Sequence, residues 1–160
     1  MAASLPLLPR VVFTVLEPVS LIAGFLGPFI SPSFFVSSQV PRPTSEPHLL
    51  LSTEHVLALQ LGNAYLLLAF LGLFILNTTN ELKTVRAYLA ALWLGDIGHV
   101  AVTAWALGVT GLMDIGGWNA VTWGNIGATL ALFFVRSLYF LGAFGQDASP
   151  SHRSGGRKDL

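Results

Sequence analysis

HVLALQLGNAYLLLAFLGLFIL, residues 55–76, decides the fold class of this 160-residue chain. After its opening His55 the stretch carries no charged side chain. A helix needs about 20 apolar residues to cross the roughly 30 Å hydrocarbon core of a bilayer. The stretch therefore predicts a membrane-spanning helix.

Three further stretches of similar length and composition flank it: Arg10–Ile30, Arg86–Val109 and Asn119–Gly142. Only 10% of the chain is charged, whereas soluble domains carry about 25% charged residues. We predict an all-α, polytopic membrane protein built as a four-helix transmembrane bundle over residues 1–143. Its spans are expected at about 10–30, 55–76, 86–109 and 119–142, and a disordered cytoplasmic tail at 144–160.

The basic residues predict the orientation of the bundle. With four spans, both termini and the second connection share one side of the membrane. The other side carries only Arg42, and the positive-inside rule therefore predicts cytoplasmic termini. The basic residues on the predicted cytoplasmic side are Arg10, Lys83, Arg86, Arg153, Arg157 and Lys158.

Composition also excludes several function classes. The absence of cysteine excludes disulfides, thiol catalysis and iron–sulfur ligation. A formal net charge of zero without a basic patch argues against a nucleic-acid partner. No histidines and acids follow a standard metal-site spacing, so we expect no metal and no cofactor. The expected partners are membrane lipid, a lipophilic small molecule, a second copy of the chain or another protein.

Charged groups at membrane depth are the first part of a candidate site. Glu17 and Arg136 lie at similar depths from the predicted cytoplasmic ends of the first and fourth spans. Ionisable groups in a bilayer are costly and usually face the bundle interior, so we expect these two to pair. The pair serves either as a strut between two helices or as part of a reactive site.

Asp96 and His99 are the second part. Their spacing of three residues places them on one face of the third span. An acid beside an imidazole can orient its tautomer and raise its basicity, although the same pair can serve as interhelical glue. Gln60 and Asn63 repeat the spacing on the second span, with Asn63 expected beside Asp96. The remaining members of this predicted polar seam are Asn119, Trp123 and Asn125. They serve either as packing contacts between helices or as ligands.

Backbone signals accompany the seam. Pro18 follows Glu17 and removes a helical hydrogen bond to Thr14, which predicts a local break in helix geometry. Glycines flank the polar residues of the third and fourth spans, and small residues let membrane helices approach closely. We therefore expect close helix contacts at Gly95, Gly98, Gly124 and Gly127.

Four segments together resemble a family of small fungal membrane proteins with four helices and no assigned activity. They are residues 10–20 (RVVFTVLEPVS), 60–67 (QLGNAYLL), 95–99 (GDIGH) and 118–127 (WNAVTWGNIG), and the similarity covers about residues 8–143. The resemblance implies a fungal source, a membrane location and an association with secondary metabolism. A looser likeness to the sterol isomerases related to emopamil-binding protein aligns no motif residue by residue, and no site is carried over from it.

Three functions stay open on these residues. The first is a structural or accessory membrane component whose seam specifies helix packing. The second is a membrane-embedded isomerase or cyclase for a terpenoid, sterol or polyketide, with His99 as general acid or base, Asp96 orienting it and Glu17 as a second acid. The third is a small proton-linked transporter or channel using the same groups. The endoplasmic reticulum is the default location.

Overall fold

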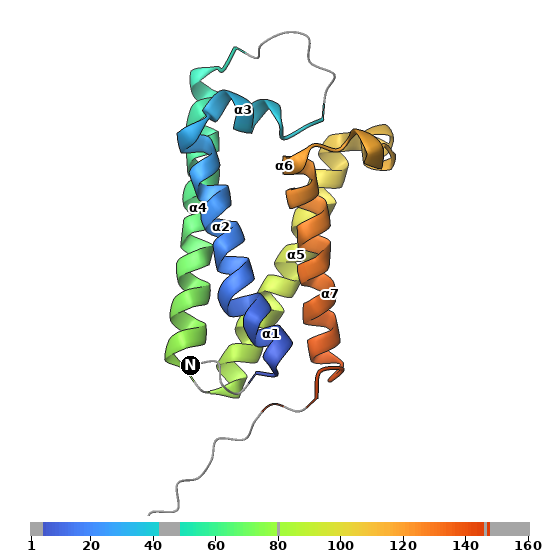
Figure 1. Ribbon diagram of the computed structural model, residues 1–160. Coiled ribbons are helices and arrows are strands. Elements are labelled where there is room, and N and C mark those ends of the chain that lie inside the picture. Colours follow the sequence, from blue (N-terminus) through green and yellow to red (C-terminus); the bar gives the residue numbers. More distant parts are fainter. Residues whose placement is uncertain (1–4, 42–48, 80, 146, 148–160) are drawn as a thin grey trace, which may run out of the picture.

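Four apolar helices confirm the predicted fold class in the computed structural model, which describes residues 5–41, 49–79, 81–145 and 147 (Figure 1). The helices long and apolar enough to cross a membrane are Leu7–Ile30, Ser52–Thr78, Leu82–Met113 and Ala120–Phe140. The described residues contain helices and connecting segments and no strand. The beginning of the first span, the end of the fourth and the connection between the second and third lie at one end of the molecule (Figure 1).

The first span changes helix type where the sequence predicts a break. It consists of α1 (Leu7–Val11), the π-helical segment η1 (Val12–Leu16) and α2 (Glu17–Ile30). Pro18 has no N–H to donate to the carbonyl of Thr14, and this carbonyl lies inside η1. A wider π turn is a common response to a missing helical hydrogen bond. This irregularity directly precedes Glu17, the acid of the predicted pair.

The first two spans form one tightly packed pair. α2 runs along α4 (Ser52–Thr78), and the short α3 (Pro32–Ser37) covers one end of both. A Cβ atom added to Gly62 of α4 would lie 2.8 Å from the Pro28 side chain and 3.1 Å from the carbonyl of Phe25. A Cβ on Gly24 would lie 2.9 Å from the Tyr65 ring. Glycine at these positions therefore permits the close approach of α2 and α4.

The glycines that we expected to hold helices together do not do so. A Cβ on Gly95, Gly98 or Gly124 would have no described atom within 4 Å, outside the local backbone. At Gly127 it would meet only the Trp123 ring, one turn earlier in the same span. The prediction was wrong because small residues allow a close contact without determining which face of a helix receives a partner.

The third and fourth spans form the second pair. α5 (Leu82–Met113) packs against α7 (Thr129–Phe140), and α7 is preceded by the short α6 (Ala120–Thr122) and the π-helical η3 (Trp123–Ala128). The indole N–H of Trp93 donates to the Ser137 hydroxyl at 2.9 Å, and the Trp93 and Phe133 rings stack at 5.5 Å. Gly108 breaks α5 with φ 67°, and the chain beyond it turns away from the bundle (Figure 1). The 3₁₀ turn η2 (Ile115–Gly117) completes the connection.

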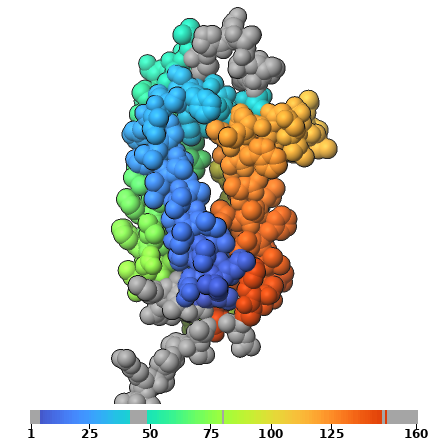
Figure 2. Space-filling view, viewed as in Figure 1, coloured from blue at the N-terminus to red at the C-terminus, as the bar shows by residue number. Residues whose placement is uncertain are grey.

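The two pairs meet at both ends and diverge between them. At the end where the first span begins, an apolar core joins them, formed by Leu5, Phe13, Leu76, Val85, Leu89 and Tyr139. At the other end, the Asn119 side chain donates to the carbonyl of Ser38 at 3.0 Å. Figure 2 shows a hollow in the surface between α2 and the η3–α7 segment, and α5 passes behind this hollow (Figure 1). We call this hollow the groove.

The segment after α7 returns toward the bundle. Phe144 packs against the apolar core, and the Asp147 carboxylate contacts Arg86 of α5. Positive φ angles at Gly142 (75°) and Gly145 (90°) permit this turn. Contacts with the bundle thus extend into the segment expected as a disordered tail, and residues 148–160 of that segment lie outside the described residues.

Candidate functional site

A buried cluster of one arginine and two acids joins three spans. Arg136 of α7, whose side chain is 0% exposed, donates through Nη2 to Glu17 of α2 and through Nη1 to Asp96 of α5. Its guanidinium carbon lies 5.2 Å from the centre of the Phe13 ring, within the range of a cation–π contact. The predicted Glu17–Arg136 ion pair is therefore confirmed. We call Glu17, Asp96 and Arg136 the triad.

Asp96 has a different partner from the one expected. It binds Arg136 and not Asn63. Counting residues from the helix ends fails here, because the start of α5 at Leu82 and the end of α7 at Phe140 do not lie at the same level. The hydrogen bond from Trp93 to Ser137 sets the antiparallel register of α5 and α7, and this register brings Asp96 level with Arg136.

His99 lies one turn beyond Asp96 on α5 and is half-buried. Its imidazole lies close enough to Asp96 for the two side chains to interact electrostatically. Among the described residues, its ring has no hydrogen-bond partner, and the Asp96 carboxylate is held by Arg136 instead. The two residues are thus neighbours, as predicted, without the direct hydrogen bond by which Asp96 would orient the imidazole.

The amides of the second span lie outside the triad. Gln60 and Asn63 are both exposed, and neither has a side-chain hydrogen bond within the described part of the chain. Gly62 faces α2, and at about 100° per residue Gln60 and Asn63 point roughly 200° and 100° away from that contact. The prediction that Asn63 lies beside Asp96 was wrong, because the small face of α4 packs on α2 and determines its rotation.

The polar residues of the fourth span contact the segment that follows α3, at the end of the molecule opposite the apolar core. Asn125 donates to the Gln39 side chain at 3.1 Å, not to Gln60. The Asn119 side chain caps α6 by accepting from the backbone N–H of Thr122 at 2.9 Å. Gln39 was missed, because the sequence places it in a proline-rich loop with nothing to indicate that it returns to the bundle. Trp123, half-exposed, contacts the Trp118 ring at 5.1 Å.

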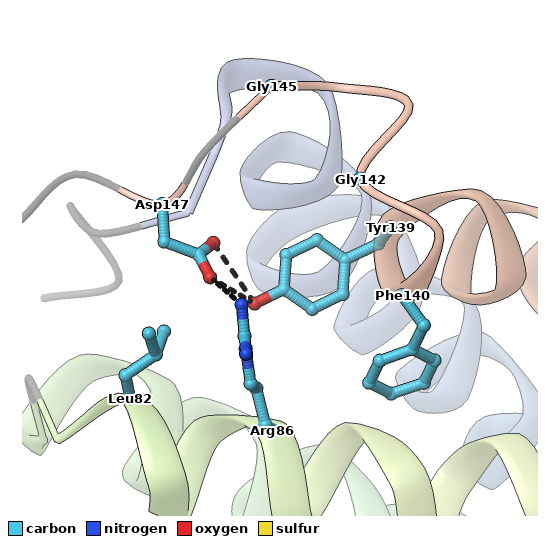
Figure 3. A pocket seen from close by; sticks show the side chains of 7 residues that line it. All are labelled: Leu82, Arg86, Tyr139, Phe140, Gly142, Gly145 and Asp147. Atoms are coloured by element: carbon cyan, nitrogen blue, oxygen red, sulfur yellow. Dashed lines mark hydrogen bonds and ion pairs between the residues drawn. The ribbon is translucent and has the colours of Figure 1, made fainter.

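A second charged cluster lies at the end of α5 and α7 (Figure 3). The Arg86 guanidinium pairs with Asp147 at 2.8 Å, and the Tyr139 hydroxyl donates to the same carboxylate at 3.1 and 3.2 Å. A pocket of about 540 Å³ opens beside them, lined also by Leu82, Phe140, Gly142 and Gly145. In the sequence, Arg86 served only to predict which side of the membrane is cytoplasmic. Nothing in the sequence connected Arg86 with Asp147.

The triad differs from a simple ion pair in its charge. Two carboxyl groups contact one guanidinium, so one acid is in surplus. The side chains of Glu17 and Asp96 are 10% and 11% exposed, whereas Arg136 is fully enclosed. The Arg136 Nε–H has no partner among the described residues. The arrangement can therefore hold and release a proton at a position that a molecule in the membrane can approach.

Comparison with known proteins gives a family and no activity. No curated protein and no solved structure matches the chain. A family model described as a domain of unknown function (DUF7704) matches residues 2–146, which include all four spans and every residue of the triad. The chain therefore belongs to the DUF7704 family, whose matched region contains the four apolar helices and the buried triad.

Proposed function

We propose that the protein is a membrane-embedded isomerase or cyclase that holds a lipophilic molecule in the groove and exchanges a proton with it. The observation that carries this proposal is the surplus acid of the triad: two carboxyl groups contact one guanidinium, and both are slightly exposed. Proton transfer by a positioned acid or base is the chemistry that these residue types support without a cofactor.

The position of the groove supports a lipophilic ligand. Two contacts between its walls bound it: Glu17 to Arg136 at one end, and Gln39 to Asn125 at the other. The wall from Asn125 to Arg136 rises about 1.5 Å per residue, which gives a groove roughly 16 Å long. Both walls are apolar spans, so a terpenoid, sterol or polyketide chain would lie along them with a reactive group at the triad.

The half-buried imidazole adds a second proton-transfer group. His99 lies one helical turn from Asp96, so a reacting atom near Asp96 would be within reach of both. We assign His99 as general acid or base and the Glu17–Asp96 pair as the acid that completes the exchange. Arg136 is a positioning residue, because its side chain is completely enclosed.

A direct experiment is to purify the protein in mild detergent and to analyse the molecules that co-purify with it by mass spectrometry. Wild type and the matched control Asn63→Ala, a change at an exposed amide outside the triad, are expected to retain about one lipophilic molecule per chain. His99→Gln and Asp96→Asn should melt close to wild type while retaining much less of it. Recovery of bulk lipid alone from wild type would contradict the proposal.

A structural or accessory role is the second candidate, and one observation favours it. Arg136 links α2 and α5 through its two carboxylate contacts, as expected of an interhelical joint. In that case His99→Gln would leave both folding and bound molecules unchanged, while Asp96→Asn would weaken folding and lipid retention together. The fungal source, the endoplasmic reticulum and the association with secondary metabolism remain predictions from the sequence.

A further inference from the structure

We propose that Glu17 and Asp96 share one bound proton in the folded protein at neutral pH, so that the triad is electrically neutral within the membrane. This proposal rests on the proposed function and deepens it, since the shared proton would be the one that the site exchanges. The proton belongs to the pair, because two acids in contact with one guanidinium titrate together.

The charges of the triad do not balance while both acids are ionised. With both acids ionised, Glu17, Asp96 and Arg136 would carry a net charge of −1 between spans that are otherwise apolar. An uncompensated charge in a bilayer is costly, and buried charged groups are normally paired or neutralised. One proton on the two acids removes the excess and leaves a single ion pair with Arg136.

The two acids receive few hydrogen bonds from the described residues. Within the described residues, each acid receives one hydrogen bond from Arg136, and the structure gives neither carboxylate a further donor. An ionised buried carboxylate is normally stabilised by several donors. The Arg136 Nε–H, a donor that could have served such a purpose, has no partner. Among the described residues the triad thus offers one protein donor to each acid, which suits one ionised and one protonated carboxyl group better than two ionised ones.

The surrounding groups leave one rival position for the proton. The described groups that interact electrostatically with the triad are Tyr88 and His99, both on α5. The η1 segment contributes the uncharged ring of Phe13, and α4 brings no charged side chain to the triad. A protonated His99 could also balance the surplus acid. However, the ring bonds to neither carboxylate, so a proton on His99 would not add a donor to the acids.

Infrared spectroscopy of the full-length protein in lipid nanodiscs tests the proposal, because a protonated carboxyl group has a C=O stretch separate from carboxylate bands. Wild type at neutral pH should show one such band, shifted in D₂O. Glu17→Gln and Asp96→Asn should each lose it, since the remaining acid then pairs one to one with Arg136. The matched control His99→Gln should keep it.

Several results would overturn the proposal. They are the absence of the band from wild type, its persistence at full intensity in both single variants, and its loss in His99→Gln. If one single variant fails to fold, the other variant and a pH titration of the wild-type band still decide whether the band belongs to the Glu17–Asp96 pair. A missing lipophilic molecule in mass spectrometry would remove the proposed function and leave the band unchanged, so the two failures are distinguishable.

Discussion

Two arginines bind carboxylates among the residues that the structure describes, and their guanidinium groups differ in solvent access. Arg136 is fully enclosed and contacts two acids from two other spans. The Arg86 side chain is 57% exposed and contacts one acid, Asp147, from the segment that follows α7; the Asp147 side chain is 6% exposed. The first cluster lies between the two helix pairs, and the second lies at the end of the bundle (Figure 3).

The contrast shows how solvent access determines what the same chemical contact does. A pair in contact with water can be replaced by hydration and is screened by salt, so it contributes little to stability. A buried cluster has no such replacement, and removal of one partner leaves an uncompensated charge. Arg136 with at least one of its two acids is therefore expected to be essential for folding, and Arg86 to contribute much less.

The largest effect is expected from Arg136→Met. The change leaves Glu17 and Asp96 facing each other without a cation, and breaking a buried pair in this way costs about 3–5 kcal/mol. The free energy of unfolding measured in mixed detergent micelles should fall by that amount. An unchanged value would show that the triad is not enclosed as described.

The control for this variant is the triple change Arg136→Met, Glu17→Gln and Asp96→Asn. It removes every charge of the triad, and neutral replacement of a buried ion cluster is often tolerated. Most of the lost stability should return. A triple variant as unstable as Arg136→Met alone would mean that lost packing around Phe13 causes the effect, not charge.

The smallest effect is expected from Arg86→Gln. Arg86 is 57% exposed, and its partner Asp147 is 6% exposed but keeps the hydrogen bond from Tyr139. Loss of a cation that lies largely in water should lower the free energy of unfolding by about 0.2–1 kcal/mol, and by less at high salt. The same unfolding assay at low and high salt is the measurement. A loss comparable to that of Arg136→Met would remove the distinction between the two clusters.

The sequence was sufficient for the parts of the structure that depend on local composition. The length of the apolar stretches predicts the four spans. Pro18 predicts the irregular turn before Glu17. The pairing of Glu17 with Arg136 follows from depth and charge alone. These inferences need no knowledge of how one helix is rotated against another.

The remaining contacts depend on rotation and register, which the sequence does not encode locally. Asp96 meets Arg136 because Trp93 and Ser137 set the register of α5 and α7. Gln60 and Asn63 lie outside the triad because Gly62 packs α4 against α2. Open glycines such as Gly98 and packed ones such as Gly62 look alike in a sequence and differ only in the face that the fold covers.

The most direct test of the surplus acid in the triad is the stability of Glu17→Gln, Asp96→Asn and the double variant at neutral pH. Each single variant keeps one acid for Arg136, so its melting temperature should stay close to that of wild type. The double variant leaves Arg136 buried without a counter-ion and should lose about 3–5 kcal/mol. If each single variant is as unstable as the double variant, both acids are required as charged partners, and the triad has no surplus acid.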